Sequence, residues 1–193
     1  MLGLKLATDP RWVNIVEKDI AEILTDHAWC EQKAASNAIS LTVHFPDHTE
    51  LVNAMIELAQ EELSHFKMVV EKLTERGLVL GRQRKDEYVN DLLHFVRKDG
   101  DKKNVLLDKL LFAAMVEARS CERFRILSEN FSDPDLKTFY HNLMASEAGH
   151  YKLFISLARK YIDREIVDKR WQEFLEYEAK IISNYGKAVG MHG

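Results

Sequence analysis

Apolar residues recur at intervals of three and four positions along most of the chain, with polar residues between them. This period is typical of amphipathic helices. Asp9 followed by proline predicts the start of a short helical segment, and a long helix is expected to continue from about residue 17 toward Thr42. The segment 44–49 contains a proline and is expected to end that helix.

Thr49 is expected to cap a second helix, which runs from about Glu50 to Arg76 and is closed by Gly77. Two helices joined by so short a turn usually lie antiparallel to each other. We therefore predict a first helical hairpin over about 17–77.

The segment over about 78–103 is polar and punctuated by glycine, with one short helical candidate over 86–97. We interpret it as a crossover that joins two hairpins. Asn104 is expected to cap a third helix, which reaches Glu129.

Asp133 followed by proline repeats the cap signal and predicts a fourth helix that ends near Tyr161. The third and fourth helices would form a second hairpin over about 104–161. A fifth amphipathic helix is expected over about 163–186, with its apolar side packed on the bundle or on a second subunit. That apolar side comprises Trp171, Phe174, Leu175, Ile181, Ile182 and Tyr185.

The composition favours one all-α domain over residues 1–193, because 46% of the residues are hydrophobic and only three are proline and eight glycine. No apolar run approaches the roughly 20 residues of a membrane span, and the N-terminus does not resemble a signal peptide. We expect a soluble, cytoplasmic protein. Cys30 and Cys121 have no metal or redox spacing, so we expect them to be reduced and buried.

Two of the predicted helices each carry a glutamate and a histidine three positions apart, Glu62 with His65 and Glu147 with His150. Residues three apart share a helix face, so each pair can direct an oxygen and a nitrogen to one point. A single pair of this kind is weak evidence, since about one is expected by chance in a chain of this composition. Both pairs, however, lie mid-helix among apolar residues, where a charge is costly unless it is paired or bound to metal.

Each pair has a further glutamate upstream, because Glu31 precedes Glu62 by 31 residues and Glu117 precedes Glu147 by 30. In an antiparallel hairpin, two residues lie level when they are equidistant from the turn. Both midpoints fall in the expected turns, so each glutamate should face the Glu-x-x-His pair of its own hairpin.

Three alternatives stay open. Glu122 competes with Glu117, although its midpoint with Glu147 is further from the turn. Glu61 also shares a helix face with His65, but the symmetry of the hairpins favours Glu62. His27, one turn before Glu31, is a seventh candidate, and a hydrogen-bonded histidine beside the site is the more common role.

The preferred set is four carboxylates and two imidazoles, which suits Fe or Mn better than zinc or calcium. Four carboxylates also balance the charge of two divalent ions. Ferritin-like di-iron proteins use this arrangement, with a glutamate from each of two helices and Glu-x-x-His from the other two. The sequence therefore predicts a ferritin-like four-helix bundle with two iron ions. The predicted metal ligands are Glu31, Glu62, His65, Glu117, Glu147 and His150.

The net charge of −4 gives no general argument for nucleic-acid binding, so such binding would need a local basic patch. Two clusters are candidates, although a solvated surface is the ordinary role of such residues. The clusters are Arg82, Arg84, Lys85, Arg97, Lys98, Lys102 and Lys103, and Arg159, Lys160, Arg164, Lys169 and Arg170.

At these motifs the chain resembles the tRNA 2-methylthio-isopentenyladenosine hydroxylase family, and the resemblance covers nearly its full length. The segment 117–124, EARSCERF, is the most specific, since ferritins and rubrerythrins in general do not share it. All six predicted ligand positions agree with the family. The other matching segments are 27–35 (HAWCEQKAA), 61–66 (EELSHF), 75–77 (ERG), 88–93 (YVNDLL) and 146–151 (SEAGHY).

The resemblance implies a di-iron monooxygenase that uses dioxygen to hydroxylate the isopentenyl side chain of a modified adenosine beside the tRNA anticodon. It also implies an external electron donor, a protein or a reductase. Two other classes remain as alternatives: an iron-storing or peroxide-detoxifying protein like ferritins and rubrerythrins, and a helical interaction module whose carboxylates only form buried salt bridges.

Overall fold

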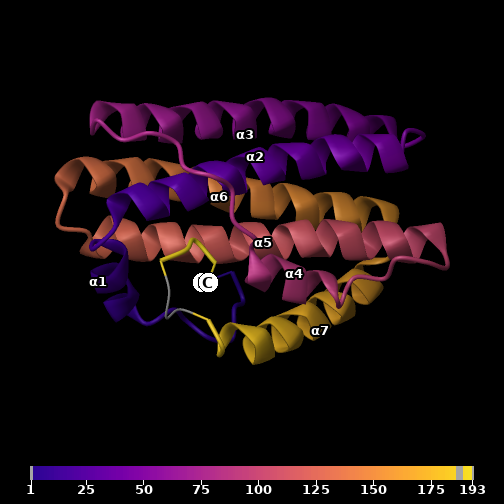
Figure 1. Cartoon of the computed structure of the whole chain (residues 1–193). Helices are drawn as coiled ribbons and strands as arrows, with labels where there is room; N and C mark the ends of the chain where they lie inside the picture. Colours follow the sequence, from indigo (N-terminus) through magenta and orange to yellow (C-terminus); the bar gives the residue numbers. More distant parts are fainter. Residues whose placement is uncertain (1, 186–188, 193) are drawn as a thin grey trace. The chain divides into compact units, whose positions relative to one another are not determined.

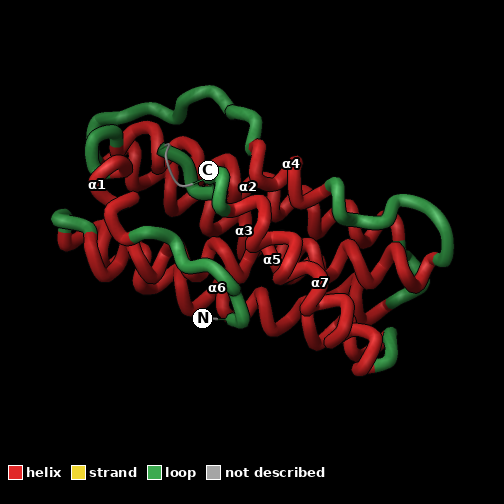
Figure 2. Tube along the Cα trace, turned by 90° about the horizontal axis from the view of Figure 1, so that it is seen from below, coloured by secondary structure: helices red, strands yellow, loops and turns green. Residues whose placement is uncertain are grey.

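The computed structural model describes residues 2–185 and 189–192, and in this part of the chain it contains helices and loops but no strand (Figure 2). The chain divides into two compact units, which we describe separately. The hairpin unit comprises residues 18–85 and 189–191. The large unit comprises the described residues of 2–17, 86–185 and 192.

The hairpin unit is built on two long helices, α2 (Ile20–His44) and α3 (Thr49–Glu75), which pack along each other (Figure 1). The long first helix begins at Ile20. The preceding helical segment ends at Val16, and the Asp19 side chain caps the new helix by accepting a hydrogen bond from the backbone N–H of Glu22. The prediction that Thr49 caps α3 is wrong. Thr49 is the first helical residue, and the N-cap is His48, which makes no capping hydrogen bond through its side chain.

The end of α3 follows the prediction, since Gly77 adopts a positive φ of 69° and the backbone N–H of Leu78 bonds back to the carbonyl of Leu73. The chain then runs without regular structure to residue 85. Part of this segment is fixed to α2, because the indole N–H of Trp29 donates to the carbonyl of Gly81 at 3.0 Å.

The large unit is built on α5 (Lys102–Asn130) and α6 (Pro134–Tyr161), a second pair of long helices that pack along each other. Asp133 caps α6 as predicted, and the helix ends at Tyr161. The cap of α5 is Asp101 instead of Asn104, since its carboxylate accepts from the backbone N–H of Lys103. Asp lies one turn earlier than the residue that the sequence pattern favoured and is an equally good cap.

Shorter elements complete the large unit: η1 (Pro10–Trp12), α1 (Val13–Val16), α4 (Glu87–Leu93) and α7 (Arg164–Ile182). The short helix predicted over 86–97 is confirmed only for its first half. The C-terminal helix α7 packs against α4, α5 and α6. Of its predicted apolar side, Trp171, Phe174, Leu175 and Ile182 are buried.

The described helices include none with the length and apolar character needed to cross a membrane.

Candidate metal centre

Three predicted ligands lie together in the hairpin unit. Glu31 lies on α2, and Glu62 and His65 lie on α3. All three are buried, with 4%, 1% and 6% of their surface exposed. One ligand atom of each lies within 4.8 Å of the others. The antiparallel pairing of α2 and α3 therefore brings Glu31 level with the Glu-x-x-His pair, as its distance from the turn predicted.

The spacing of these atoms suits a metal ion. His65 Nδ1 lies 3.5 Å from Glu31 Oε2 and 3.6 Å from Glu62 Oε2. Transition metals bind such ligand atoms at about 2.1 Å, so two ligands about 115° apart around one ion would be separated by about 3.5 Å. The three residues fit a divalent cation in both donor chemistry and spacing.

The electrostatics of this cluster favour a positive charge among the carboxylates. Burial lowers the pKa of His65, but the nearby carboxylates of Glu31 and Glu62 outweigh it and raise the pKa to about 10. Burial likewise raises the pKa of Glu31, yet His27 and His65 hold it well below its usual range. A cation in place of the imidazole proton would meet the same two carboxylates.

Two of the residues left open by the sequence also lie here. His27 is fully buried, and its Nε2 lies 2.6 Å from Glu31 Oε1, the carboxylate oxygen that does not face His65. It is therefore placed to orient Glu31. The Glu61 side chain is 49% exposed and lies 3.9 Å from His65 Nε2, so it belongs to the edge of the cluster.

The other three predicted ligands lie in the large unit, with Glu117 on α5 and Glu147 and His150 on α6. Their exposed fractions are 5%, 2% and 4%. Three acidic or imidazole side chains are thus buried on two helices that pack along each other. Burial of this kind is costly for a carboxylate without a cation.

Glu122, the competitor of Glu117, is bound to other groups. Its Oε1 accepts from the backbone N–H of Thr8 at 2.9 Å, and its Oε2 accepts from the Thr8 hydroxyl at 2.7 Å. Arg119 donates to the same Oε2 at 3.0 Å. Both oxygens of Glu122 are therefore used within the large unit, which leaves Glu117 as the better metal-ligand candidate on α5.

Comparison with known proteins agrees with the motifs. The family described as tRNA-(MS[2]IO[6]A)-hydroxylase (MiaE) matches residues 2–193. The chain belongs to this family. The tRNA 2-(methylsulfanyl)-N(6)-isopentenyladenosine(37) hydroxylase of Pseudomonas putida is 35% identical over 185 residues, which are 96% of this chain and 89% of that protein. The Salmonella typhimurium protein of the same name is 36% identical over 143 residues, which are 74% of this chain and 52% of that protein.

A solved structure resembles this member of the MiaE family over nearly its whole length. It is described as Protein 43 with aldehyde deformylating oxygenase activity from Synechococcus. The TM-score is 0.92 at 34% identity, with 98% of this chain and 95% of that chain covered. The predicted all-α, ferritin-like fold class is confirmed.

One buried cluster of this MiaE-family chain, around Arg119, has partners that no sequence motif predicts. Arg119 donates to Glu178 of α7 through Nε at 2.9 Å and Nη2 at 2.6 Å. Thr8 and Glu178 carry no motif and lie 114 and 56 residues from Glu122. The signal in the sequence is the position of Glu178, which lies one turn from both Phe174 and Ile182 on the apolar side of the helix, where a carboxylate needs a partner.

Proposed function

We propose that this protein is a di-iron tRNA hydroxylase that inserts one oxygen atom into the isopentenyl side chain of 2-methylthio-isopentenyladenosine beside the anticodon. The observation that carries the proposal is the match to the MiaE family over residues 2–193. Two relatives that bear the name of this hydroxylase support it, at 35% and 36% identity. Action on tRNA would place the protein in the cytoplasm.

We further propose that residues 1–193 act as one di-iron domain with six metal ligands: Glu31, Glu62 and His65 in the hairpin unit, and Glu117, Glu147 and His150 in the large unit. The spacing around His65 Nδ1, 3.5 and 3.6 Å to two carboxylates, supports a metal ion at the first group. The matching Glu-x-x-His and level glutamate of the second hairpin support a second ion there. Both groups offer the oxygen and nitrogen donors that iron accepts.

The bound irons would supply the activation of dioxygen, which hydroxylation of an allylic C–H bond requires. The reaction is balanced by two electrons from an external donor and two protons, since one oxygen atom enters the C–H bond and the other leaves as water. The protein itself holds the ligands in place. His27 contacts Oε1 of Glu31 and so orients the carboxylate, whose other oxygen, Oε2, lies on the side of His65.

Small residues near the ligands would make room for the prenyl chain. Ala35 and Ala38 on α2 and Ala113 and Ala114 on α5 are all buried, and each lies about one or two turns from a proposed ligand. Larger side chains at these positions would fill the space beside the metal ions. Apolar walls also suit an isopentenyl group.

The direct test is hydroxylation of tRNA by the purified protein. The protein is loaded with ferrous ion without oxygen, and tRNA that carries 2-methylthio-isopentenyladenosine is added with dioxygen and a reductase system. We expect the nucleoside to gain one oxygen atom, about 16 mass units, by mass spectrometry. Boiled protein and protein loaded with zinc serve as controls. If the protein is fully loaded with iron and the nucleoside is unchanged, the assignment of this substrate is rejected.

Aldehyde deformylation is the second candidate, because the Synechococcus protein with that printed activity is 34% identical and has a TM-score of 0.92. The same iron-loaded protein is therefore given a long-chain aldehyde in place of tRNA. We expect no loss of the formyl carbon, as measured by gas chromatography. Turnover of the aldehyde without turnover of tRNA would replace the first proposal by the second.

A further inference from the structure

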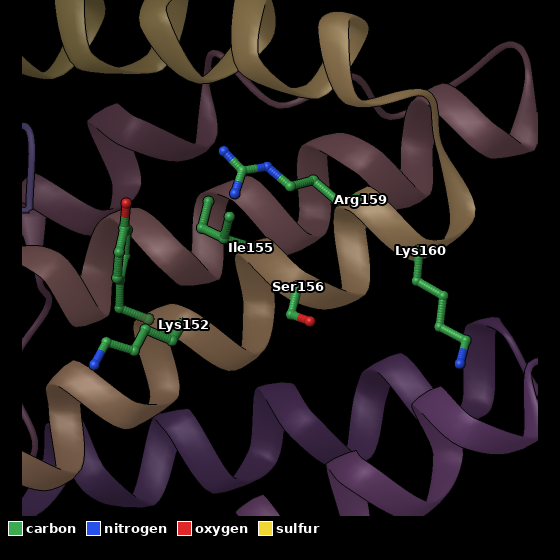
Figure 3. Close-up of a pocket in the computed structure, with 6 residues that line it drawn as sticks. Lys152, Ile155, Ser156, Arg159 and Lys160 are labelled. Carbon is green, nitrogen blue, oxygen red and sulfur yellow. The ribbon is translucent and has the colours of Figure 1, made fainter.

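The surface of α6 carries a hollow that no role described above uses. Its volume is about 560 Å³, and it is lined by Tyr151, Lys152, Ile155, Ser156, Arg159 and Lys160. Figure 3 shows Lys152 and Lys160 at its two ends, with Ser156 between them. The lining contains three cationic side chains and no carboxylate. Such a surface is suited to an anion.

We propose that this face of α6 binds the phosphate backbone of the RNA substrate, an inference that rests on the proposed function. The face is defined here as Lys152, Ser156, Arg159 and Lys160, and all four residues are exposed. The large unit alone provides it, since every residue of the lining belongs to one helix.

The helical register separates the basic face from the proposed metal ligands. At about 100° per residue, its four residues fall within an arc of about 100° on the side of α6 opposite Glu147 and His150. One side of this helix therefore presents buried metal ligands, and the other presents hydrated cations. RNA phosphates are best bound on the latter side, because only the target base has to leave water.

The length of the face suits several phosphates. Lys152 and Lys160 are eight residues apart, which corresponds to about 12 Å along the helix. One strand of double-helical DNA carries a phosphate about every 3.4 Å along its axis, and at a similar spacing this length spans three or four phosphates. Ser156 lies midway and offers a hydroxyl to a phosphate oxygen.

Arg159 of this face shares an acidic partner with Arg164 of α7. Arg159 donates from Nε and Nη2 to Asp168 Oδ1 at 3.0 and 2.6 Å, and Arg164 lies 3.5 Å from the other oxygen of Asp168. The arginine hydrogen bonds lower the pKa of Asp168, which keeps it ionised. One carboxylate thus serves two guanidinium groups, and these exposed contacts are weak enough to exchange for phosphate.

The apolar part of the lining offers a second kind of RNA contact. Tyr151 packs against Trp171 of α7 with ring centroids 5.7 Å apart, and Ile155 is buried beside it. Proteins that bind single-stranded RNA combine cationic side chains with aromatic rings on which bases stack. The overall charge of −4 makes this local combination more significant, because general attraction to RNA is absent.

The test is binding of a fluorescent anticodon stem-loop RNA, followed by anisotropy at several salt concentrations. We expect the double variant Lys152→Ala/Lys160→Ala to bind at least about tenfold more weakly than the wild type. The slope of log K against log salt should fall by about 1.4, since each lost phosphate contact on a single strand contributes about 0.7. Alanine is a good helix former, and circular dichroism checks that α6 is intact.

The matched control is Lys180→Ala, because Lys180 is an exposed lysine of the same unit on α7. It lies 16 residues from the start of α7, about 24 Å along that helix. Its removal should leave both the affinity and the salt slope unchanged. An equal loss of RNA affinity in Lys180→Ala would show that the effect comes from the net charge of the protein and not from this face. It would overturn the proposal.

Kinetics separate this inference from the proposed function. We expect the double variant to raise KM for RNA while kcat at saturating RNA stays within about twofold. If the wild type hydroxylates the RNA and the double variant binds the RNA as tightly as the wild type, the phosphate site is overturned and the proposed function stands. A wild type that neither binds nor hydroxylates the RNA would overturn the function and this site together. Loss of turnover with unchanged RNA affinity would indicate docking of an acidic electron donor and would also overturn it.

Discussion

Two buried clusters of carboxylates in this molecule are built from different partners. In the hairpin unit, Glu31 and Glu62 face the imidazole of His65 at 3.5 and 3.6 Å. In the large unit, Glu122 and Glu178 share the guanidinium of Arg119 at 3.0 and 2.6 Å. The second cluster supplies its own cation, whereas the first offers an imidazole that metal ions also bind.

The partners decide what each cluster can do. The guanidinium of arginine stays charged and has only hydrogen-bond donors, so it cannot bind a metal ion. The Arg119 cluster can therefore serve only to hold elements together. It connects α5 to α7 through Glu178 and to the N-terminal segment through the carbonyl of Leu6 and through Thr8. An imidazole exchanges its proton for a metal ion. A buried glutamate is therefore a metal-ligand candidate only when no arginine already serves it.

Glu62→Gln is the strongest test of the His65 cluster. The amide keeps the size of the side chain but removes the negative charge, so iron is held more weakly and the proposed hydroxylation should fall at least about 100-fold. Iron analysis and nucleoside mass spectrometry measure both effects. The neighbouring variant Glu61→Gln is the control and should keep activity within about twofold, because Glu61 is half exposed. Equal losses in both variants would contradict the choice of Glu62.

A second comparison lies on α5 itself. Glu117→Gln should lower the iron content and abolish hydroxylation, whereas Glu122→Gln should keep iron and instead lower stability by about 1–3 kcal/mol, because its hydrogen-bond partners Thr8 and Arg119 stay buried. Metal analysis together with urea unfolding separates the two. Full iron content in Glu117→Gln would return Glu122 to the metal centre.

Arg119→Met tests the structural cluster directly. The change leaves Glu122 and Glu178 buried without their shared cation, and breaking a buried ion pair costs about 3–5 kcal/mol. We expect the free energy of unfolding to fall by that amount in urea. The triple change Arg119→Met, Glu122→Gln and Glu178→Gln should recover part of it. A loss below about 1 kcal/mol would mean that the cluster contributes little.

Asp108 extends the comparison to pH. Burial raises its pKa, but hydrogen bonds from Arg97 and Arg170 outweigh this effect, and the pKa is lowered overall. A carboxylate with a lowered folded-state pKa stabilises the fold above its unfolded pKa of about 3.9, and this contribution is lost as the pH falls through the folded value.

The free energy of unfolding of the wild type should therefore fall more steeply than that of Asp108→Asn as the pH drops below about 4. At pH 7 the variant should be the less stable protein. Urea titrations at each pH provide the measurement. Parallel pH curves for the two proteins would show that Asp108 has no part in acid unfolding.

The smallest effect is expected from Thr8→Val. The substitution removes the hydroxyl that donates to Glu122 at 2.7 Å and leaves the backbone N–H of residue 8 in place. One hydrogen bond to a charged group contributes about 1.5–3 kcal/mol, and Arg119 compensates part of the loss, so we expect about 1 kcal/mol. Iron content should not change. A reduced iron content would connect the Arg119 cluster to the metal centre.

The sequence alone predicted the helices and the six metal-ligand candidates, because both follow from local periodicity. The 3.6-residue period indicates which residues share a face, and distance from a turn indicates which residues lie level in a hairpin. These rules bring Glu31 to Glu62 and His65 without any knowledge of the rest of the chain. They failed at helix starts, where Thr49 and Asn104 compete with neighbours of similar capping strength.

Only the tertiary structure decided the roles of the residues that surround the candidates. Glu117 and Glu122 are both glutamates of the same helix, and their local sequence does not fully separate their roles. Their difference comes from Thr8 and from Glu178 of α7, which approach α5 from distant parts of the sequence. The role of a buried charged group depends on the group that compensates its charge. Packing between distant parts of the chain determines which group that is.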